Sequence, residues 1–284
     1  MDLYIEKDGL KTRMSSLGVL VQDIQVSNAA VESNRKRING KNGNLFMGAT
    51  HTEKKISVVG KYYVSDELQD ELMKDRLNGI FADTEPYFIT RMYNTGTLYD
   101  FERPGQKSGF DLFKSESQRK YHYRYKVLLD GEIDYSFMGY SSRGLLYEVS
   151  FTFVTADIPF GLTIPKTLEL PVENGFIEYK GTAPCSQLEW PWSLQIKVNQ
   201  SQGNTFSFTL GERRFVYKSS DRLISSGDEF SLEGTSFTLN GLNVNDKTNL
   251  EYFVLTPTER GFIPYSTTLA NSSIKLINKV DFYR

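Results

Sequence analysis

The sequence predicts a mainly β protein with two domains, an N-terminal α+β domain that holds one helix and a C-terminal antiparallel β-sandwich. Its 284 residues exceed the usual length of a single domain. Apolar and polar residues alternate along much of the chain, which is typical of strands buried on one face. Only one stretch, near residues 66–78, has helical periodicity instead.

Five stretches of the first half alternate in this way and are predicted as strands. They are residues 56–64, 87–93, 121–129, 133–137 and 145–153. The stretches 121–129 and 145–153 are long, and we expect them to offer sheet edges with which a neighbouring subunit can pair.

The predicted helix begins after Ser65, which we expect to be its N-cap, and ends at about Asn78. Asp66 and Glu67 stand where the helix dipole favours anions. Asn78 is followed by Gly79, a pair suited to the left-handed turn that stops a helix. The expected apolar face consists of Leu68, Leu72, Met73 and Leu77.

Closely spaced prolines mark the expected domain boundary, because proline removes a backbone donor and fixes φ. They are Pro159, Pro165, Pro171, Pro184 and Pro191. We therefore expect a first domain at residues 1–165 and a second at residues 166–284.

The second half contains seven short strand-like stretches separated by glycine-rich turns, which predicts a β-sandwich. They are residues 194–198, 205–210, 214–217, 229–232, 236–239, 249–255 and 274–277. Phe206 and Phe208 are two residues apart on one strand, so we expect both to point into the interior.

Composition argues against several classes of function. The net charge of −2 gives no overall attraction to nucleic acid or to anionic lipid. No segment reaches the roughly 18 apolar residues of a membrane span, so no membrane partner is expected. The single cysteine, Cys185, cannot form an intrachain disulfide, which is compatible with folding in a bacterial cytoplasm.

Groups with reactive potential are few. The two histidines, His51 and His122, and Cys185 lack the paired spacing of zinc ligands, so no metal is expected. The sequence has no glycine-rich phosphate loop, and we expect no cofactor. Scattered carboxylates leave a cell-wall hydrolase as an alternative, but nothing singles out a catalytic pair. The prediction is a protein without enzymatic activity.

A basic segment at residues 31–61 contrasts with the nearly neutral chain. Asn39-Gly40 and Asn42-Gly43 predict a turn, so the segment is expected to form a long hairpin with a basic tip. The candidate contacts to a neighbouring subunit, or non-specifically to phosphates of passing DNA, are Arg35, Lys36, Arg37, Lys41, Lys54 and Lys55. The alternative is a solvated hairpin edge whose charges only prevent aggregation.

Two tryptophans support an alternative function. Trp190 and Trp192 flank Pro191 just before the first strand of the expected sandwich. If exposed, their rings could stack on a sugar. A carbohydrate-binding adhesin that recognises a bacterial cell-wall glycan is therefore the second hypothesis.

Two segments of the first half resemble the distal tail proteins of siphophages that infect Gram-positive bacteria. One is KISVVGKYYVSD at residues 55–66, followed by a helix with an acidic start, and the other is EVSFTFVTADIPFG at residues 148–161. Residues 181–184 and 227–242 are more loosely similar to the C-terminal part of that family. The resemblance covers nearly the whole chain, and its motifs are patterns of strand, glycine and turn.

The resemblance implies a structural protein of the phage baseplate. Its first domain would form a hexameric ring that continues the tail tube, and a galectin-like second domain would hold outer proteins. The implied partners are further copies of the chain, the tail tube protein, a tail-associated adhesion or lysin protein, and a receptor-binding or side-fibre protein. The implied location is the virion tail tip, with synthesis and assembly in the host bacterial cytoplasm.

Overall fold

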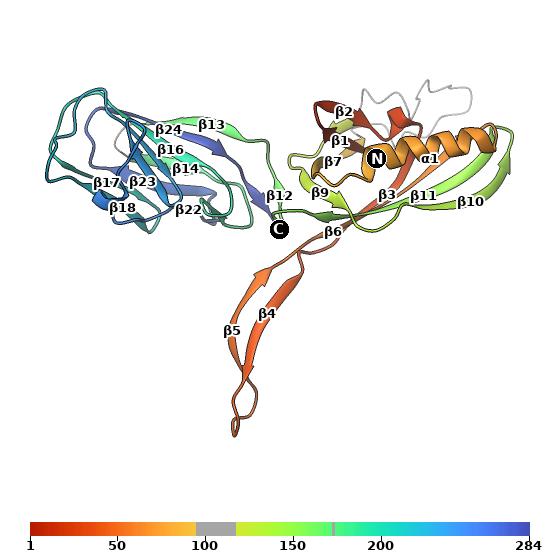
Figure 1. Ribbon diagram of the computed structural model, residues 1–284, viewed down its shortest axis with the longest axis horizontal. Helices are drawn as coiled ribbons and strands as arrows, with labels where there is room; N and C mark the ends of the chain where they lie inside the picture. The colour runs from red at the N-terminus through yellow and green to blue at the C-terminus, as the bar shows by residue number, and fades with distance from the viewer. Residues whose placement is uncertain (95–117, 172–173) are drawn as a thin grey trace. The chain divides into compact units, whose positions relative to one another are not determined.

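The computed structural model describes residues 1–94, 118–171 and 174–284 and shows two compact units, Met1–Gly161 and Leu162–Arg284 (Figure 1). The protein is mainly β, as predicted, and has one α-helix within those ranges. None of the helices described there is long and apolar enough to span a membrane.

The first unit is built on a nine-stranded antiparallel sheet in the order β2-β1-β7-β9-β11-β6-β3, with β10 also paired to β11 and β8 to β7. A short 3₁₀ helix, η1 (Ser15–Leu17), follows β2. The strands are β1 (Asp2–Lys7), β2 (Leu10–Arg13), β3 (Leu20–Val26), β6 (Lys55–Val64), β7 (Tyr87–Asn94), β8 (Gln118–Lys120), β9 (Tyr125–Leu129), β10 (Asp134–Ser141) and β11 (Gly144–Thr155).

Two sequence predictions about these strands are wrong. The stretch 121–129 is not one strand, because the chain leaves the sheet at Tyr121 and β9 starts at Tyr125. Neither β9 nor β11 is a free edge: β9 pairs with β7 and β11, and β11 also pairs with β6. Strands whose alternate side chains are apolar and face the core are buried most effectively in the middle of a sheet.

The helix α1 (Glu67–Phe81) starts and ends later than predicted. Its N-cap is Asp66, whose Oδ1 accepts a hydrogen bond from the backbone N of Gln69 at 2.9 Å. This bond, followed by one from Ser65, lowers the pKa of the Asp66 carboxyl. The helix continues past Gly79 because Phe81 is fully buried in the core, and that packing outweighs the poor helix propensity of glycine.

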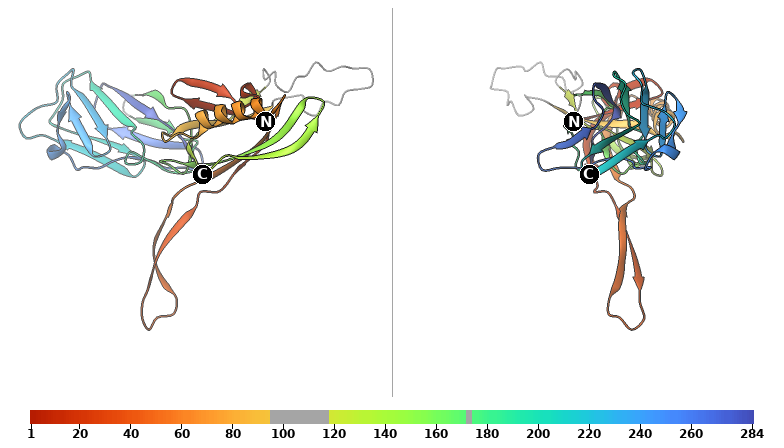
Figure 2. Two further views of the ribbon diagram at one scale, coloured as in Figure 1. Left: turned by 45° about the vertical axis from the view of Figure 1, so that its right-hand side comes forward. Right: turned by 90° about the vertical axis from the view of Figure 1, so that its left-hand side faces the viewer.

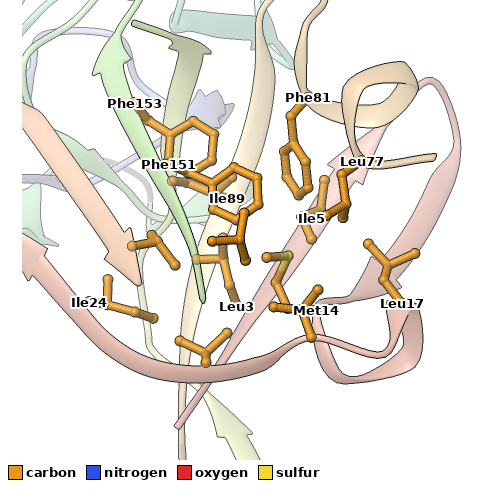
Figure 3. Packing of buried hydrophobic residues seen from close by; sticks show 14 of the residues in the cluster. Leu3, Ile5, Met14, Leu17, Ile24, Leu77, Phe81, Ile89, Phe151 and Phe153 are labelled. Atoms are coloured by element: carbon orange, nitrogen blue, oxygen red, sulfur yellow. The ribbon is translucent and has the colours of Figure 1, made fainter. Parts of the chain in front are cut away.

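The core of the first unit lies between α1 and one face of the sheet (Figure 3). Phe81 packs with its ring centroid 4.8 Å from that of Phe151 and 5.8 Å from that of Phe153. Leu77 is buried beside it, as predicted. Leu68 and Leu72, expected on the same apolar face, are instead 69% and 53% exposed.

The second unit has the expected arrangement of two antiparallel sheets. One contains six strands in the order β13-β24-β16-β19-β20-β21, and the other contains four in the order β14-β23-β17-β18. Phe206 and Phe208 of β17 are buried, which confirms their predicted position. The stretch 249–255 is not a full strand, because Leu250 has a left-handed φ of 55° that extended backbone cannot adopt.

These strands are β13 (Lys166–Leu170), β14 (Asn174–Glu178), β16 (Ser193–Val198), β17 (Thr205–Leu210), β18 (Arg213–Lys218), β19 (Glu229–Glu233), β20 (Ser236–Leu239), β21 (Leu242–Asn243), β23 (Phe262–Thr267) and β24 (Ser272–Lys279). The remaining short elements are β12 (Gly161–Leu162), β15 (Cys185–Ser186), β22 (Val254–Leu255), β25 (Phe282–Tyr283) and the 3₁₀ helix η4 (Asn245–Lys247).

Gly144 at the start of β11 is predicted to be intolerant of a side chain. Its φ is 113°, and an added Cβ would lie 2.2 Å from the carbonyl oxygen of Val64. We expect Gly144→Ala to lower the free energy of unfolding by about 1–3 kcal/mol in urea denaturation. Gly139→Ala is the control, because Gly139 has a φ of 133° with open space around it. Equal losses in the two variants would contradict a role for the close contact with Val64.

Candidate assembly interface

Strands β4 (Val31–Arg37) and β5 (Asn44–His51) form a hairpin whose side chains are almost all exposed. It continues the β3–β6 ladder, since the backbone N of Ser27 donates to the oxygen of Lys55 at 2.9 Å and that of Thr52 to Ala30 at 3.0 Å. The hairpin thus projects from the sheet of the first unit as a two-stranded ribbon (Figure 2). Gly40 and Gly43 in its turn have positive φ, as the two Asn-Gly pairs predict.

The hairpin is shorter than predicted. It ends at His51, because residues 55–64 belong to β6, which pairs with both β3 and β11. Lys55 therefore lies in the main sheet, where its Nζ is 2.7 Å from Asp130 Oδ2, and this pair raises the pKa of Lys55. Lys54 is only 3% exposed and is not part of an exposed basic surface.

Four of the six predicted basic residues remain on the hairpin. Arg35, Lys36 and Arg37 follow one another in β4, and Lys41 lies in the turn, all of them exposed. Their role in assembly or in contact with DNA remains a prediction.

Large apolar side chains accompany these charges on the hairpin. Phe46 and Met47 of β5 are each 63% exposed. Val31, Ile38 and Leu45 are exposed as well. Apolar groups gathered on a segment that has no core of its own are characteristic of a surface that another protein covers.

The helix α1 presents a second exposed surface with the opposite charge. Glu67, Glu71 and Asp75 follow at intervals of four residues and lie exposed beside Leu68 and Leu72. We call these five residues the acidic face of α1. The sequence analysis did not predict this surface, because it assigned Leu68 and Leu72 to the core. Helical periodicity alone does not distinguish residues of a core from residues of an interface.

Strand β10 carries a third exposed apolar group. Phe137, Met138 and Tyr140 are 50%, 51% and 82% exposed, and in the described part of the chain β10 pairs only with β11. The ring of Phe137 lies 5.4 Å from that of Tyr147, and Lys74 of α1 lies 5.8 Å from the same Tyr147 ring. This patch therefore lies close to α1.

Of the two tryptophans, only Trp190 is partly exposed, and its contact with a sugar stays a prediction. Trp192 is fully buried and its Nε1 donates to the oxygen of Cys185 at 3.3 Å, so its ring is not available to a glycan. Trp190 is partly buried, and its Nε1 donates to the oxygen of Asn278 at 3.0 Å. A hollow of about 570 Å³ on the six-stranded sheet has neither tryptophan in its lining.

The residues considered for metal or nucleophilic chemistry are not brought together. Burial raises the pKa of the Cys185 thiol, which favours its unreactive form. The ring of His51 packs edge-on against Phe160 with 5.5 Å between centroids. Within residues 1–94, 118–171 and 174–284, no three His, Cys, Asp or Glu side chains are placed to hold a metal ion.

Exposed surfaces that combine large apolar side chains with charges are typical of proteins that assemble with other proteins. Residues 7–151 match the family described as phage tail protein RIFT-related domain, and the match spans half of the chain. The chain belongs to this family of phage tail proteins. No curated protein sequence matches it.

Solved structures of phage tail components are similar to this chain. The Dit protein of phage SPP1, described as a paradigm of the hub adsorption apparatus in phages infecting Gram-positive bacteria, has 12% identity and a TM-score of 0.65 over 99% of both chains. The baseplate of phage p2 in its activated conformation has 13% identity over 99% of both chains and a TM-score of 0.37. The family match and the fold shared with SPP1 Dit confirm the predicted resemblance to siphophage distal tail proteins.

Proposed function

We propose that this protein is a structural, non-enzymatic distal tail protein whose copies form a ring between the tail tube and the host-adhesion device. The observation that carries the proposal is the complementarity of two surfaces of the first unit. The hairpin combines Arg35, Lys36 and Arg37 with exposed apolar side chains, and the acidic face of α1 combines three carboxylates with two exposed leucines. In this proposal the hairpin of one copy binds the acidic face of the next.

Such an interface is heterologous, because the donating and receiving surfaces are different parts of the same chain. Heterologous contacts generate a ring when the rotation between copies closes. A twofold dimer would require a self-complementary surface, and neither the basic hairpin nor the acidic helix face complements itself. The family resemblance implies six copies.

The apolar residues are expected to supply most of the binding energy. Complete burial of a side chain such as Phe46 or Leu72 is worth about 1.5–3 kcal/mol before the costs of association. Opposite charges on the two surfaces accelerate the encounter and select the orientation. An isolated two-stranded hairpin is only marginally stable in water, so a neighbouring copy would also stabilise β4 and β5.

The two units would have different tasks. The first, residues 1–165 in the sequence prediction, would form the ring and contact the tail tube protein and the tail-associated adhesion or lysin protein. The second, residues 166–284, would carry a receptor-binding or side-fibre protein at the tail tip. What supports this division is the presence of the interface surfaces on the first unit and the similarity to SPP1 Dit over the whole chain.

Electron microscopy and mass measurement of the purified protein test the ring. We expect wild type to form closed rings and Phe46→Ser/Met47→Ser to remain monomeric, because the double variant removes the apolar tip contacts. The matched control is Phe176→Ser/Phe262→Ser, which removes two exposed phenylalanines of the second unit, 69% and 50% exposed, and should still form rings. A wild type that stays monomeric at high concentration would contradict the ring, and rings of the hairpin variant would contradict its interface.

A further inference from the structure

Two cations lie among tyrosines at one end of the core face of the first sheet. Along β7 the buried residues Tyr87 and Ile89 are followed on the same face by Arg91. Ile89 pairs with Tyr125 of β9, and Lys54, which immediately precedes β6, is joined to Thr155 by two hydrogen bonds. The apolar core is thus replaced at this end by charged and phenolic side chains.

Lys54 is the more buried of the two cations. Lys54 is only 3% exposed, and its Nζ lies 5.6 Å from the centroid of the Tyr125 ring. Burial, and secondly the charge of Arg91, lower the pKa of Lys54. Among the described residues no carboxylate forms an ion pair with it.

Arg91 lies within a cage of tyrosine rings. Its guanidinium carbon is 4.9 Å from the ring centroid of Tyr121 and 5.8 Å from those of Tyr93 and Tyr123. Its Nη2 donates to the hydroxyl of Tyr123 at 3.1 Å, while its buried Nε has no hydrogen-bond partner. No carboxylate of the described chain pairs with Arg91 either.

Other partly buried cations of this unit are neutralised. Lys7 Nζ is 2.6 Å from Asp83, and Arg124 is 3.1 Å from Glu6. Lys54 and Arg91 contact Tyr125 and Tyr123, whose ring centroids are 5.5 Å apart. Lys54 is buried and Arg91 is partly buried, and proteins normally pair such cations with a counter-charge. The missing negative charge is therefore expected to come from outside the described chain.

We propose that Lys54 and Arg91 form a binding site for a compact oxyanion, a phosphate or a carboxylate group. The planar guanidinium fork and the ammonium can each donate to oxygens of such a group, as in charge-assisted pairs elsewhere. The tyrosine rings pack around Arg91 and hold its guanidinium in place. The anion can be a free phosphate or an acidic side chain of another tail protein, since both present the same oxygens.

Thermal unfolding of the full chain in inorganic phosphate or in acetate, each against chloride at equal ionic strength, tests the site. An anion that binds the folded protein raises its Tm by mass action. We expect at least one of the two anions to stabilise wild type, and Lys54→Met to weaken its binding by about tenfold or more. A larger shift in phosphate indicates a phosphate ligand, and a larger shift in acetate indicates an acidic side chain.

The matched control is Lys55→Met, which removes the neighbouring exposed lysine and the same charge. It should leave anion binding unchanged. Lys54→Met should also raise the Tm in chloride, because it removes an uncompensated buried cation, whereas a purely structural lysine would lower it. Tyr123→Phe, which removes only the hydroxyl bound to Arg91, supplies a milder variant. Equal anion effects on Lys54→Met and wild type, or no stabilisation of wild type by either anion, would overturn the proposal.

Discussion

Replacing Arg35, Lys36 and Arg37 by glutamate is expected to abolish ring formation, and adding Glu67→Lys, Glu71→Lys and Asp75→Lys to the same chain is expected to restore it. The first change places like charges on both sides of the proposed contact, and such juxtapositions cost several kcal/mol in total. Association between copies should weaken by about a hundredfold or more, since each 1.4 kcal/mol corresponds to a factor of ten. Light scattering and electron microscopy measure both effects.

A charge-matched control separates this contact from a general effect of net charge. Lys180, Lys197 and Lys275 lie on the second unit with side chains 66%, 57% and 48% exposed, and their reversal to glutamate should leave the rings intact. Phage carrying the hairpin reversal should also fail to assemble functional tails. Normal rings and normal infectivity in that variant would support the alternative of a solvated hairpin edge. Failure of the combined variant to form rings would exclude α1 as the receiving surface.

Trp192→Ala should cause the largest loss of stability in the second unit, about 3–5 kcal/mol in the free energy of unfolding. The ring is fully buried, and its removal leaves a cavity that the surrounding strands cannot fill. The carbonyl of Trp192 also accepts from Gln187 Nε2 at 3.1 Å, and the same amide donates to Leu232 at 3.0 Å. Displacement of Trp192 would disturb this buried network.

Urea denaturation followed by circular dichroism measures the loss, and fluorescence of the remaining Trp190 reports on the second unit. Trp190→Phe is the control: it keeps an aromatic ring and removes one hydrogen bond to Asn278, which should cost about 1 kcal/mol. A loss below about 1 kcal/mol for Trp192→Ala would show that this ring does not hold the sandwich together.

Local sequence patterns predicted those elements that a periodic alternation of apolar and polar residues is sufficient to identify. The alternation at residues 145–153 identified β11 because both of its faces obey a period of two. The same pattern could not show which strands are edges, since that depends on partners distant in sequence. It also missed β23, where Pro264 argues against a strand although it occupies an exposed position in a regular alternation of exposed and buried residues.

The sequence predicted the hairpin of the candidate interface but not the acidic face of α1. Basic residues on both sides of two Asn-Gly turn signals identified the hairpin. Leu68 and Leu72 were assigned to the core, because apolar residues on a helix look the same whether the covering surface belongs to the same chain or to another. The placement of Lys54 and Arg91 beside Tyr125 and Tyr123 could not be predicted from the sequence, because it depends on the order of β7, β9, β11 and β6 in the sheet.

The backbone hydrogen bonds that connect the β3–β6 pair to the hairpin have a mechanical consequence. A force that pulls on the turn near Lys41 acts along both strands of the hairpin. It therefore loads the hydrogen bonds between the strands in shear. Many ladder bonds between Val26 and Leu20 then share the strain, together with those that join β6 to β11. A subunit built in this way is expected to resist extraction of its hairpin more strongly than one whose arm is attached by a flexible loop.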